Sequence, residues 1–276
     1  MAQDGKNTKT REHRKGERLA KVIARSGLAS RREAEEMIRA ARVAVNGWLV
    51  LEPATNVTPD DEILVDGEPL PAPEPVRLWR YHKPRGRIVA RRDPQGRPTI
   101  YDDLPAELAR AQPVGRLDFN SEGLLLLTND GALKRALELP ERGWTRRYRV
   151  RAFGRVHPRA LARLQEGIVI DGVHYGPIRA ELEVADRPNK WLTFALKEGR
   201  NREIRRICEH LGLQVSRLIR TSYGPFQLGR LPRATVEEVP RKQMQELLGG
   251  LLEEVEAERF ARHPKHDGRK TDGSRR

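Results

Sequence analysis

The sequence predicts an α+β protein of two unequal parts. The smaller, N-terminal part has two helices and short strands, and the larger part has a mixed, largely antiparallel sheet flanked by helices. Three observations predict this fold class. Apolar residues recur at helical spacing in some segments and alternate in others, and strand-like segments after residue 77 are interleaved with helices of modest length. Between the parts, "PAPEP" at 71–75 interrupts regular structure and is typical of a short, stiff linker.

Two helices are predicted at the start of the smaller part. Leu19, Val22 and Ile23 share one helical face, and Gly27 offers a left-handed stop after them. The segment "SRRE", which begins at Ser30, is typical of a capping box that starts a second helix. A compact pair of helices is therefore expected.

Short strands are predicted after these helices. "RVAVNGWLV" alternates and contains Asn46-Gly47, and "DEILVDGEPL" contains Asp66-Gly67; both dipeptides favour tight hairpin turns. The whole module covers residues 17–70, which is small for an independent domain.

The larger part is predicted as one domain over residues 77–260, with 71–76 as the linker. Strands are expected in "VRLWRYHKPRGRIV", "TRRYRVRAFG", "WLTFALKEG" and "ATVEEV", and helices in "HPRALARLQEG" and "NREIRRICEHLG". "PRKQMQELLGGLLEEVEAERF" closes the domain as one helix, weakened in its middle by two glycines. The charged ends at 1–16 and 261–276 have no periodicity and are expected to be disordered basic tails.

Composition points to a polyanionic partner. The chain has 53 Lys and Arg against 39 Asp and Glu, a formal net charge of +14. It lacks the run of about eighteen apolar residues that a membrane helix needs, so we expect a cytoplasmic protein without membrane contact. The single Cys208 is expected to be a buried hydrophobe, and the seven histidines are scattered, so no metal and no cofactor is predicted. We expect a monomer.

The helix pair carries a cluster of basic residues. Taken alone, this cluster is either a solvated surface or a site for phosphates. The segment "RLAKVIARSGLASRREAEEMIRAARVAVNG" closely resembles the S4 RNA-binding domain, over about residues 17–70. That resemblance implies that the helix pair grips RNA phosphates and RNA shape. The residues expected to do so are Arg18, Lys21, Arg25, Arg31, Arg32, Arg39 and Arg42.

A lone acid, Asp118, precedes an apolar run in "GRLDFNSEGLLLLTND". "LLLLT" is typical of a short buried strand, "NDG" of a turn, and "ALKRALEL" of a helix, so Asp118 is expected in a loop that leads into a core strand. From spacing alone, Asp118 could equally cap a turn or pair with Arg116.

This segment resembles, almost position for position, the signature of the pseudouridine synthases of the RsuA and RluB branch. The resemblance implies that Asp118 is the catalytic group. By the same resemblance, Tyr148 in "RRYRV" lies against the target base and Arg205 in "EGRNREIRR" pairs with Asp118. "KPRG" and "LIRTSYGPF" also fit. The expected substrate-binding residues are Arg116, Leu218, Lys83, Arg200, Arg202 and Arg206, and Arg217 and Arg220 are further expected phosphate contacts.

The implied reaction breaks the N-glycosidic bond of a uridine and joins C5 of the same uracil to the ribose. The carboxylate either attacks C1′ or removes the 2′ proton, and the sequence does not choose between these. Arg205 would counter the desolvation that favours protonation of Asp118 in an apolar pocket. Glycosidases use two carboxylates to activate water, so the lack of an obvious second buried acid favours isomerisation over hydrolysis.

The resemblance favours ribosomal RNA, and most of all the 23S RNA of the large subunit or an assembly intermediate of that subunit. Action on 16S RNA of the small subunit stays open, because that branch shares the motifs. A non-catalytic S4-type factor that binds ribosomal RNA during assembly would explain the charge and the first domain equally well. A base-excising glycosylase is a third reading, which predicts a free base as product.

Overall fold

The computed structural model describes residues 16–184 and 189–260. The predicted tails, 1–16 and 261–276, lie outside the described residues apart from Gly16. The chain divides into two compact units, one of residues up to Pro75 together with those from Glu254 onward, the other of Val76–Glu253. The second domain was expected to extend to residue 260, whereas this division ends it at Glu253, inside the last helix.

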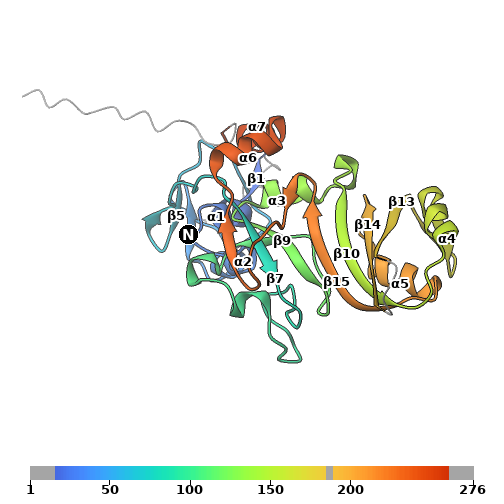
Figure 1. The fold of residues 1–276 in the computed structure, drawn as a ribbon. Coiled ribbons are helices and arrows are strands. Elements are labelled where there is room, and N and C mark those ends of the chain that lie inside the picture. The colour runs from blue at the N-terminus through green and yellow to red at the C-terminus, as the bar shows by residue number, and fades with distance from the viewer. Residues whose placement is uncertain (1–15, 185–188, 261–276) are drawn as a thin grey trace, which may run out of the picture. The chain divides into compact units, whose positions relative to one another are not determined.

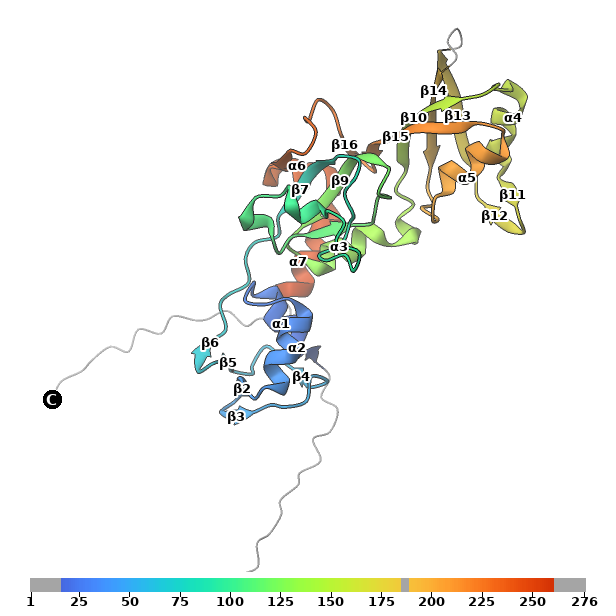
Figure 2. The same ribbon diagram turned by 90° about the horizontal axis from the view of Figure 1, so that it is seen from below.

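Up to Pro75, the described residues of the first unit form two helices and six short strands (Figures 1 and 2). They are β1 (Glu17–Arg18), α1 (Leu19–Arg25), α2 (Arg31–Arg39), β2 (Val43–Val45), β3 (Trp48–Leu49), β4 (Asn56–Val57), β5 (Ile63–Val65) and β6 (Glu68–Pro69). Four strands form a sheet in the order β3-β2-β5-β6, and β1 pairs with β4. The helices pack on each other and share one apolar core with the strands, so the expected module is present.

Local chemistry sets the ends of these elements. The Ser30 hydroxyl accepts from the Glu33 N–H, and the Glu33 carboxylate accepts from the Ser30 N–H at 2.7 Å, as the sequence predicts. Gly27 has φ +81°, which ends the turn after α1. Asn46 and Gly47 have φ values of +51° and +79°, typical of the tight turn that joins β2 to β3.

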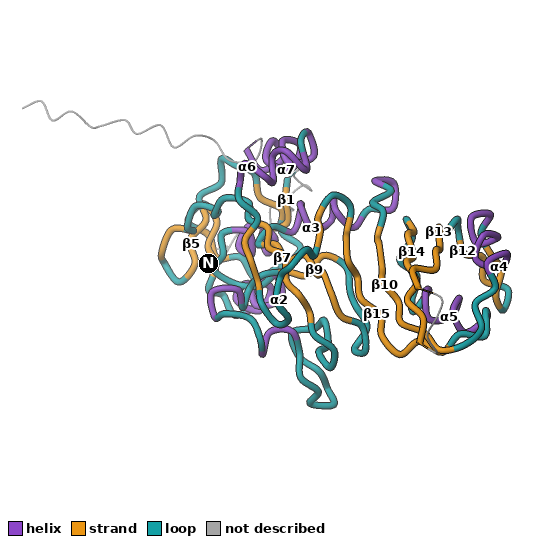
Figure 3. The backbone as a smooth tube through the Cα atoms, in the orientation of Figure 1, coloured by secondary structure: helices purple, strands orange, loops and turns teal. Residues whose placement is uncertain are grey.

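Most of the second unit surrounds one large mixed sheet (Figure 3). Its strands are β7 (Leu78–Lys83), β8 (Gln112–Val114), β9 (Glu122–Thr128), β10 (Arg146–Phe153), β13 (Ile178–Val184), β14 (Asn189–Leu196), β15 (Gln214–Tyr223), β16 (Phe226–Gln227) and β17 (Val236–Glu238). The order is β13-β14-β10-β15-β9-β7-β17, with β16 beside β15 and β8 beside β9. β11 (Ile168–Ile170) and β12 (Val173–Tyr175) form a separate hairpin.

Helices of the second unit are α3 (Gly131–Glu138), α4 (Pro158–Arg163) and α5 (Glu203–His210), followed by α6 (Arg241–Leu248) and α7 (Gly250–Phe260), which crosses into the first unit. Single 3₁₀ turns lie at Ile100–Asp102, Ala106–Leu108, Pro140–Arg142 and Leu164–Glu166. Side chains of α4 and α5 share an apolar core with β10 and β14, so these helices cover one face of that end of the sheet (Figure 1).

The sheet has one parallel junction, and it joins the two halves of the unit. β15 pairs with β9 only through Ile219 with Glu122 and Arg220 with Gly123, whereas the other pairings are antiparallel. A Cβ on Gly123, whose φ is +110°, would lie 2.3 Å from the Arg220 carbonyl oxygen. Only glycine therefore allows these strands to meet, directly after the Asp118 loop.

Two elements differ from expectation. The strand expected in "VRLWRYHKPRGRIV" covers only β7 and ends at Lys83. The closing segment was predicted as a single helix, but it forms α6 and α7, separated at Gly249 with φ +48°. Glycine adopts this left-handed conformation without steric cost, so the weak point in the predicted helix became a break.

Candidate active site

A cavity of about 790 Å³ opens where β9 and β15 meet. The Asp118 loop, β10, the start of α5, and β15 all supply side chains to it. Six of the expected catalytic and substrate-binding residues line it: Asp118, Tyr148, Arg116, Leu218, Arg200 and Arg202. Segments about a hundred residues apart in the sequence thus meet around one carboxylate.

Asp118 lies at the start of a turn that ends at Ser121, whose N–H donates to the Asp118 carbonyl at 3.0 Å. Every backbone carbonyl from 118 to 121 accepts a hydrogen bond. The Asp118 carbonyl also accepts from Lys83, which donates to the Ser121 carbonyl as well. The Phe119 carbonyl accepts from the Gly86 N–H, and the Asn120 carbonyl accepts from Arg205. The turn is thereby fixed through its backbone.

The Asp118 carboxylate itself is half-buried. Across the described part of the chain it accepts no hydrogen bond and forms no ion pair. The alternative that Asp118 is a turn cap or an Arg116 partner therefore receives no support. The side chain projects into the cavity and is available for chemistry.

Lys83 occupies a different place from the one expected. Instead of facing a substrate, it is fully buried and its Nζ donates to the carbonyls of Pro84, Asp118 and Ser121 at 2.8–3.1 Å. Burial lowers the pKa of Lys83 to about 8, against the opposing effect of the Asp118 charge. Lys83 holds the loop and does not line the cavity.

Arg205 reaches the same turn from α5. Its Nη2 donates to the Asn120 carbonyl at 3.0 Å, so in the described structure the expected ion pair with Asp118 is not formed. Desolvation and the nearby charge of Arg202 lower the pKa of Arg205, while Asp118 raises it. The Nε atom is buried without a hydrogen-bond partner among the described residues, so donor capacity remains beside Asp118.

Tyr148 and Leu218 supply apolar surface from neighbouring strands. Tyr148 pairs with Arg220 at a register shift between β10 and β15, and such bulges redirect side chains. The Tyr148 ring packs against the apolar clusters on both sides of the junction, and Leu218 is buried in the β10–β14 cluster. Together they offer a flat aromatic wall and an aliphatic one.

The remaining expected arginines behave differently from one another. Arg202 lines the cavity and holds the left-handed φ of +52° at the start of α5. Arg200 also lines it but pairs with Glu198 at 2.9 Å. Arg206 is directed away, toward the Tyr175 hydroxyl, and is not part of the lining. Its expected role as a substrate contact has no support in this geometry.

Arg217 and Arg220 are not free phosphate contacts either. Arg217 pairs with the buried Glu122, and Arg220 is 2% exposed with its Nε donating to the Leu124 carbonyl at 2.7 Å. Arg220 still lines the cavity, and its Nη2 has no hydrogen-bond partner among the described residues. The burial of Arg220 could not be predicted from the sequence, because it follows from the pairing of β15 with β9.

Two buried acids were also missed. Glu122 is buried between Arg217 and Arg233, and Glu203 lines the cavity at 4% exposure. Desolvation raises the pKa of Glu203, although the Arg200 N–H donates to it. The sequence argument from a missing second acid therefore does not hold. No acid pattern in the sequence identified either residue.

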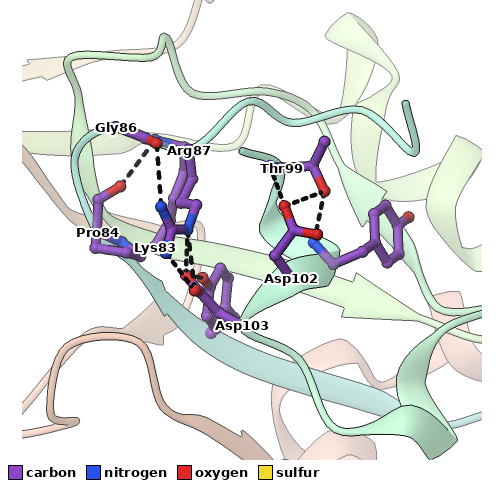
Figure 4. A network of polar contacts seen from close by, with 9 residues as sticks. Lys83, Pro84, Gly86, Arg87, Thr99, Asp102 and Asp103 are labelled. Atoms are coloured by element: carbon purple, nitrogen blue, oxygen red, sulfur yellow. Dashed lines mark hydrogen bonds and ion pairs between the residues drawn. The ribbon is translucent and has the colours of Figure 1, made fainter. Parts of the chain in front are cut away.

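Polar contacts support the cavity wall that follows Lys83 (Figure 4). Arg87 donates to both carboxylate oxygens of Asp103, which also accepts from the Tyr81 hydroxyl at 3.0 Å. At the start of the 3₁₀ turn Ile100–Asp102, the Thr99 N–H donates to the Asp102 carboxylate at 2.6 Å. These contacts anchor a long, mostly irregular segment that contributes Ile88 to Ala90 to the lining.

Across the described ranges, three or more His, Cys, Asp or Glu side chains nowhere gather as a metal site would require. The helices in those ranges are all too short or too polar to cross a bilayer.

Comparisons with known proteins match both parts of the chain. A family model described as RNA pseudouridylate synthase matches residues 77–210, and an S4 domain model matches 17–63. An uncharacterized RNA pseudouridine synthase of Rickettsia bellii is 46% identical over 82% of this chain and 98% of its own length. Ribosomal large subunit pseudouridine synthase B of Salmonella typhimurium is 42% identical over 84% of this chain and 82% of its own. A crystal structure of a pseudouridylate synthase aligns with TM-score 0.59 and 29% identity, covering 84% of this chain and all of that one.

Proposed function

Because the chain belongs to the RNA pseudouridine synthase family and carries an S4 domain, we propose that it isomerises one uridine of large-subunit ribosomal RNA with Asp118 as the reacting carboxylate. The protein is a pseudouridine synthase that acts on RNA. The catalytic residue and the choice of RNA are the proposed steps.

One observation carries the assignment of Asp118. Its carboxylate lies in the cavity without a hydrogen bond or ion pair from the described residues, although its turn is fixed at each carbonyl from 118 to 121. A structural acid would use its oxygens to satisfy the fold. A carboxylate that is fixed in place and left unpaired is suited to react.

The reaction moves a uracil within one site. The bond from N1 to C1′ breaks, the uracil turns, and C5 bonds to C1′. The C5 proton leaves to solvent and N1 takes up a proton, so the product is an isomer of the substrate. Asp118 either attacks C1′ and forms an ester that is later displaced, or takes the 2′ proton to give a glycal. Both routes retain the uracil until C5 has reacted.

The cavity walls suit the retention of the base. Tyr148 offers a ring on which a uracil can stack, and Leu218 closes the pocket with apolar surface. Arg205 does not line the cavity, but its positive charge interacts with Asp118 from behind the turn. A snug pocket of this kind accepts a base only after it has left its stack, which costs least in loops and irregular helices. Structured RNA with an accessible uridine is the matching substrate.

Two relatives, from Salmonella typhimurium and Pasteurella multocida, are named ribosomal large subunit pseudouridine synthase B. These names favour large-subunit RNA for this chain. The second candidate is small-subunit RNA, which the same cavity would accept.

The test is tritium release from large-subunit and small-subunit ribosomal RNA labelled at C5 of uridine. The intact protein should release tritium from large-subunit RNA, and Asp118→Asn should release none while binding that RNA within about threefold. Turnover by Asp118→Asn would remove Asp118 from its role. Tritium release from small-subunit RNA alone would show that small-subunit RNA is the substrate. No release from either RNA or from their assembly intermediates would favour the non-catalytic RNA-binding factor.

A further inference from the structure

An exposed aromatic residue stands at the mouth of the cavity. Phe119 follows Asp118, lines the cavity and is 37% exposed. The other large exposed hydrophobic residues of the second unit, within the described ranges, are Phe153 and Val169, and neither of them lines the cavity. Phe119 thus combines apolar exposure with proximity to the reacting group.

The backbone of Phe119 is held in place. Its carbonyl accepts from the Gly86 N–H at 2.8 Å, within the turn whose neighbouring carbonyls bind Lys83 and Arg205. The ring is backed by Gly86, since a Cβ built there would lie 4.0 Å from the Phe119 Cζ. A ring on a fixed turn loses little conformational freedom when it contacts a ligand.

Distance ties Phe119 to the RNA strand. Consecutive Cα atoms are about 3.8 Å apart, which is close to the roughly 3.4 Å rise between stacked bases in a helix. Asp118 must approach the ribose of the target uridine for the reaction to occur. Phe119 follows Asp118 directly and lines the same cavity, so its ring is close to the nucleotide that Asp118 must reach.

Taking a uridine out of its stack leaves a gap between its neighbours. Proteins that open nucleic acid stacks often insert an apolar wedge between bases, and a flat ring stacks on any base. We propose that Phe119 enters the space vacated by the target uridine and stacks on the neighbouring base, which stabilises the extruded nucleotide. This inference rests on the proposed function and adds a positioning residue to it.

Such a role predicts dependence on the structure around the uridine. Phe119 assists where the uridine starts out stacked and paired, and it matters little where the uridine is already extruded. A merely structural role in the Asp118 turn would affect both cases equally.

The test compares two large-subunit RNA transcripts under single-turnover conditions. After the modified uridine is mapped, nucleotides opposite it are changed so that one transcript pairs the uridine and the other leaves it bulged. Phe119→Ala should release tritium at least tenfold more slowly than the intact chain on the paired transcript, and less than threefold more slowly on the bulged one. Phe119→Trp should restore most of the rate, because its ring also stacks.

Phe153→Ala is the matched control, because Phe153 is 56% exposed on β10 outside the cavity lining. It should leave both rates unchanged. Equal losses of the tritium-release rate on both transcripts for Phe119→Ala, or no loss on either, would overturn the inference. Phe119→Leu keeps an apolar side chain and checks that the turn still folds. If the intact chain releases no tritium from any RNA, the proposed function fails instead.

Discussion

The two units of the molecule carry their positive charge in different ways. In the first unit, most of the seven basic residues expected to bind RNA are paired within the unit. Glu17 lies 2.7 Å from both Lys21 and Arg25, and Glu35 lies 3.6 Å and 3.9 Å from its two arginines. The two arginines beside Glu35 are Arg31 and Arg39. Arg42 donates two hydrogen bonds to Asp66, and Arg18 donates to the Ala54 carbonyl. Arg32 alone of the seven has no such partner among the described residues.

Around the cavity of the second unit, several arginines lack carboxylate partners. Arg85, Arg116, Arg202 and Arg205 form no ion pair within the described ranges. Arg85 and Arg205 donate only to backbone carbonyls. Burial and the charges of Arg202 and Arg85 lower the pKa of Arg205, whereas the charge of Asp118 raises it.

The formal charge of a unit therefore does not show how many of its basic side chains are free to bind RNA phosphates. Exposed ion pairs contribute only about 0–1 kcal/mol, so RNA phosphates can still share the paired cations of the first unit, at the expense of those pairs. The unpaired arginines of the second unit can receive a phosphate directly. We expect the first unit to supply diffuse attraction and the second to fix the position of the target nucleotide.

The largest expected effect follows from removing an unpaired arginine beside the carboxylate. Arg205→Ala should slow single-turnover tritium release at least a hundredfold, because it removes both the bond to Asn120 and the charge beside Asp118. Arg206→Ala is the control on the same helix, because Arg206 is directed to Tyr175, and it should change the rate less than twofold. Equal losses of the tritium-release rate in the two variants would show that Arg205 has no role at the site beyond that of Arg206.

Lys83 is a third kind of cation, neither paired with an acid nor exposed. Lys83→Met should lower the free energy of unfolding by about 3 kcal/mol, since buried carbonyls of the Asp118 turn lose their donor. Thermal and urea unfolding measure this loss. Lys242→Met, at an exposed position in α6, should change stability by less than about 0.5 kcal/mol. A small effect of Lys83→Met would mean that the turn does not depend on it.

The pH dependence of stability tests the same group. Its pKa is about 8 in the folded state and near 10.5 when unfolded, so between these values the unfolded chain binds more protons. Stability due to Lys83 should therefore rise as pH increases from 8 to 10.5, by roughly 2.5 kcal/mol relative to Lys83→Met. Parallel pH profiles for the two proteins would contradict the lowered pKa.

The smallest effect is expected in the first unit. Arg32→Ala should weaken RNA binding about threefold and reduce the slope of log affinity against log salt by about 1. Arg39→Ala, on the same helix but paired through Glu35, should reduce the slope less. Fluorescence anisotropy with labelled RNA at several salt concentrations separates the two variants, and identical slopes would show that pairing does not limit RNA contact.

Much of the fold could be predicted because its signals are local. The capping box at Ser30, the turn at Asn46-Gly47 and the buried strand after Asp118 each depend on neighbours within a few residues. The break at Gly249 was underestimated, because the sequence shows a weak helix position but not the left-handed conformation that the chain adopts there.

The sequence predicted which residues form the candidate site better than it predicted the contacts that those residues make. Asp118, Tyr148 and Leu218 were placed by resemblance, and they do line one cavity. The resemblance paired Arg205 with Asp118, whereas the structure joins it to Asn120. A sequence motif identifies which side chain is present, but the folded backbone around it decides which group that side chain binds.

The sequence by itself determined the helix caps, the turns, the basic character and the loop that carries Asp118. Only the tertiary structure decided that Lys83 and Arg220 are buried, that Glu203 enters the cavity and that Arg206 is directed elsewhere. The physical reason is that burial and partner choice depend on which distant strands become neighbours. Here two residue pairs between β9 and β15 bring those segments together, and they are possible because Gly123 has no side chain.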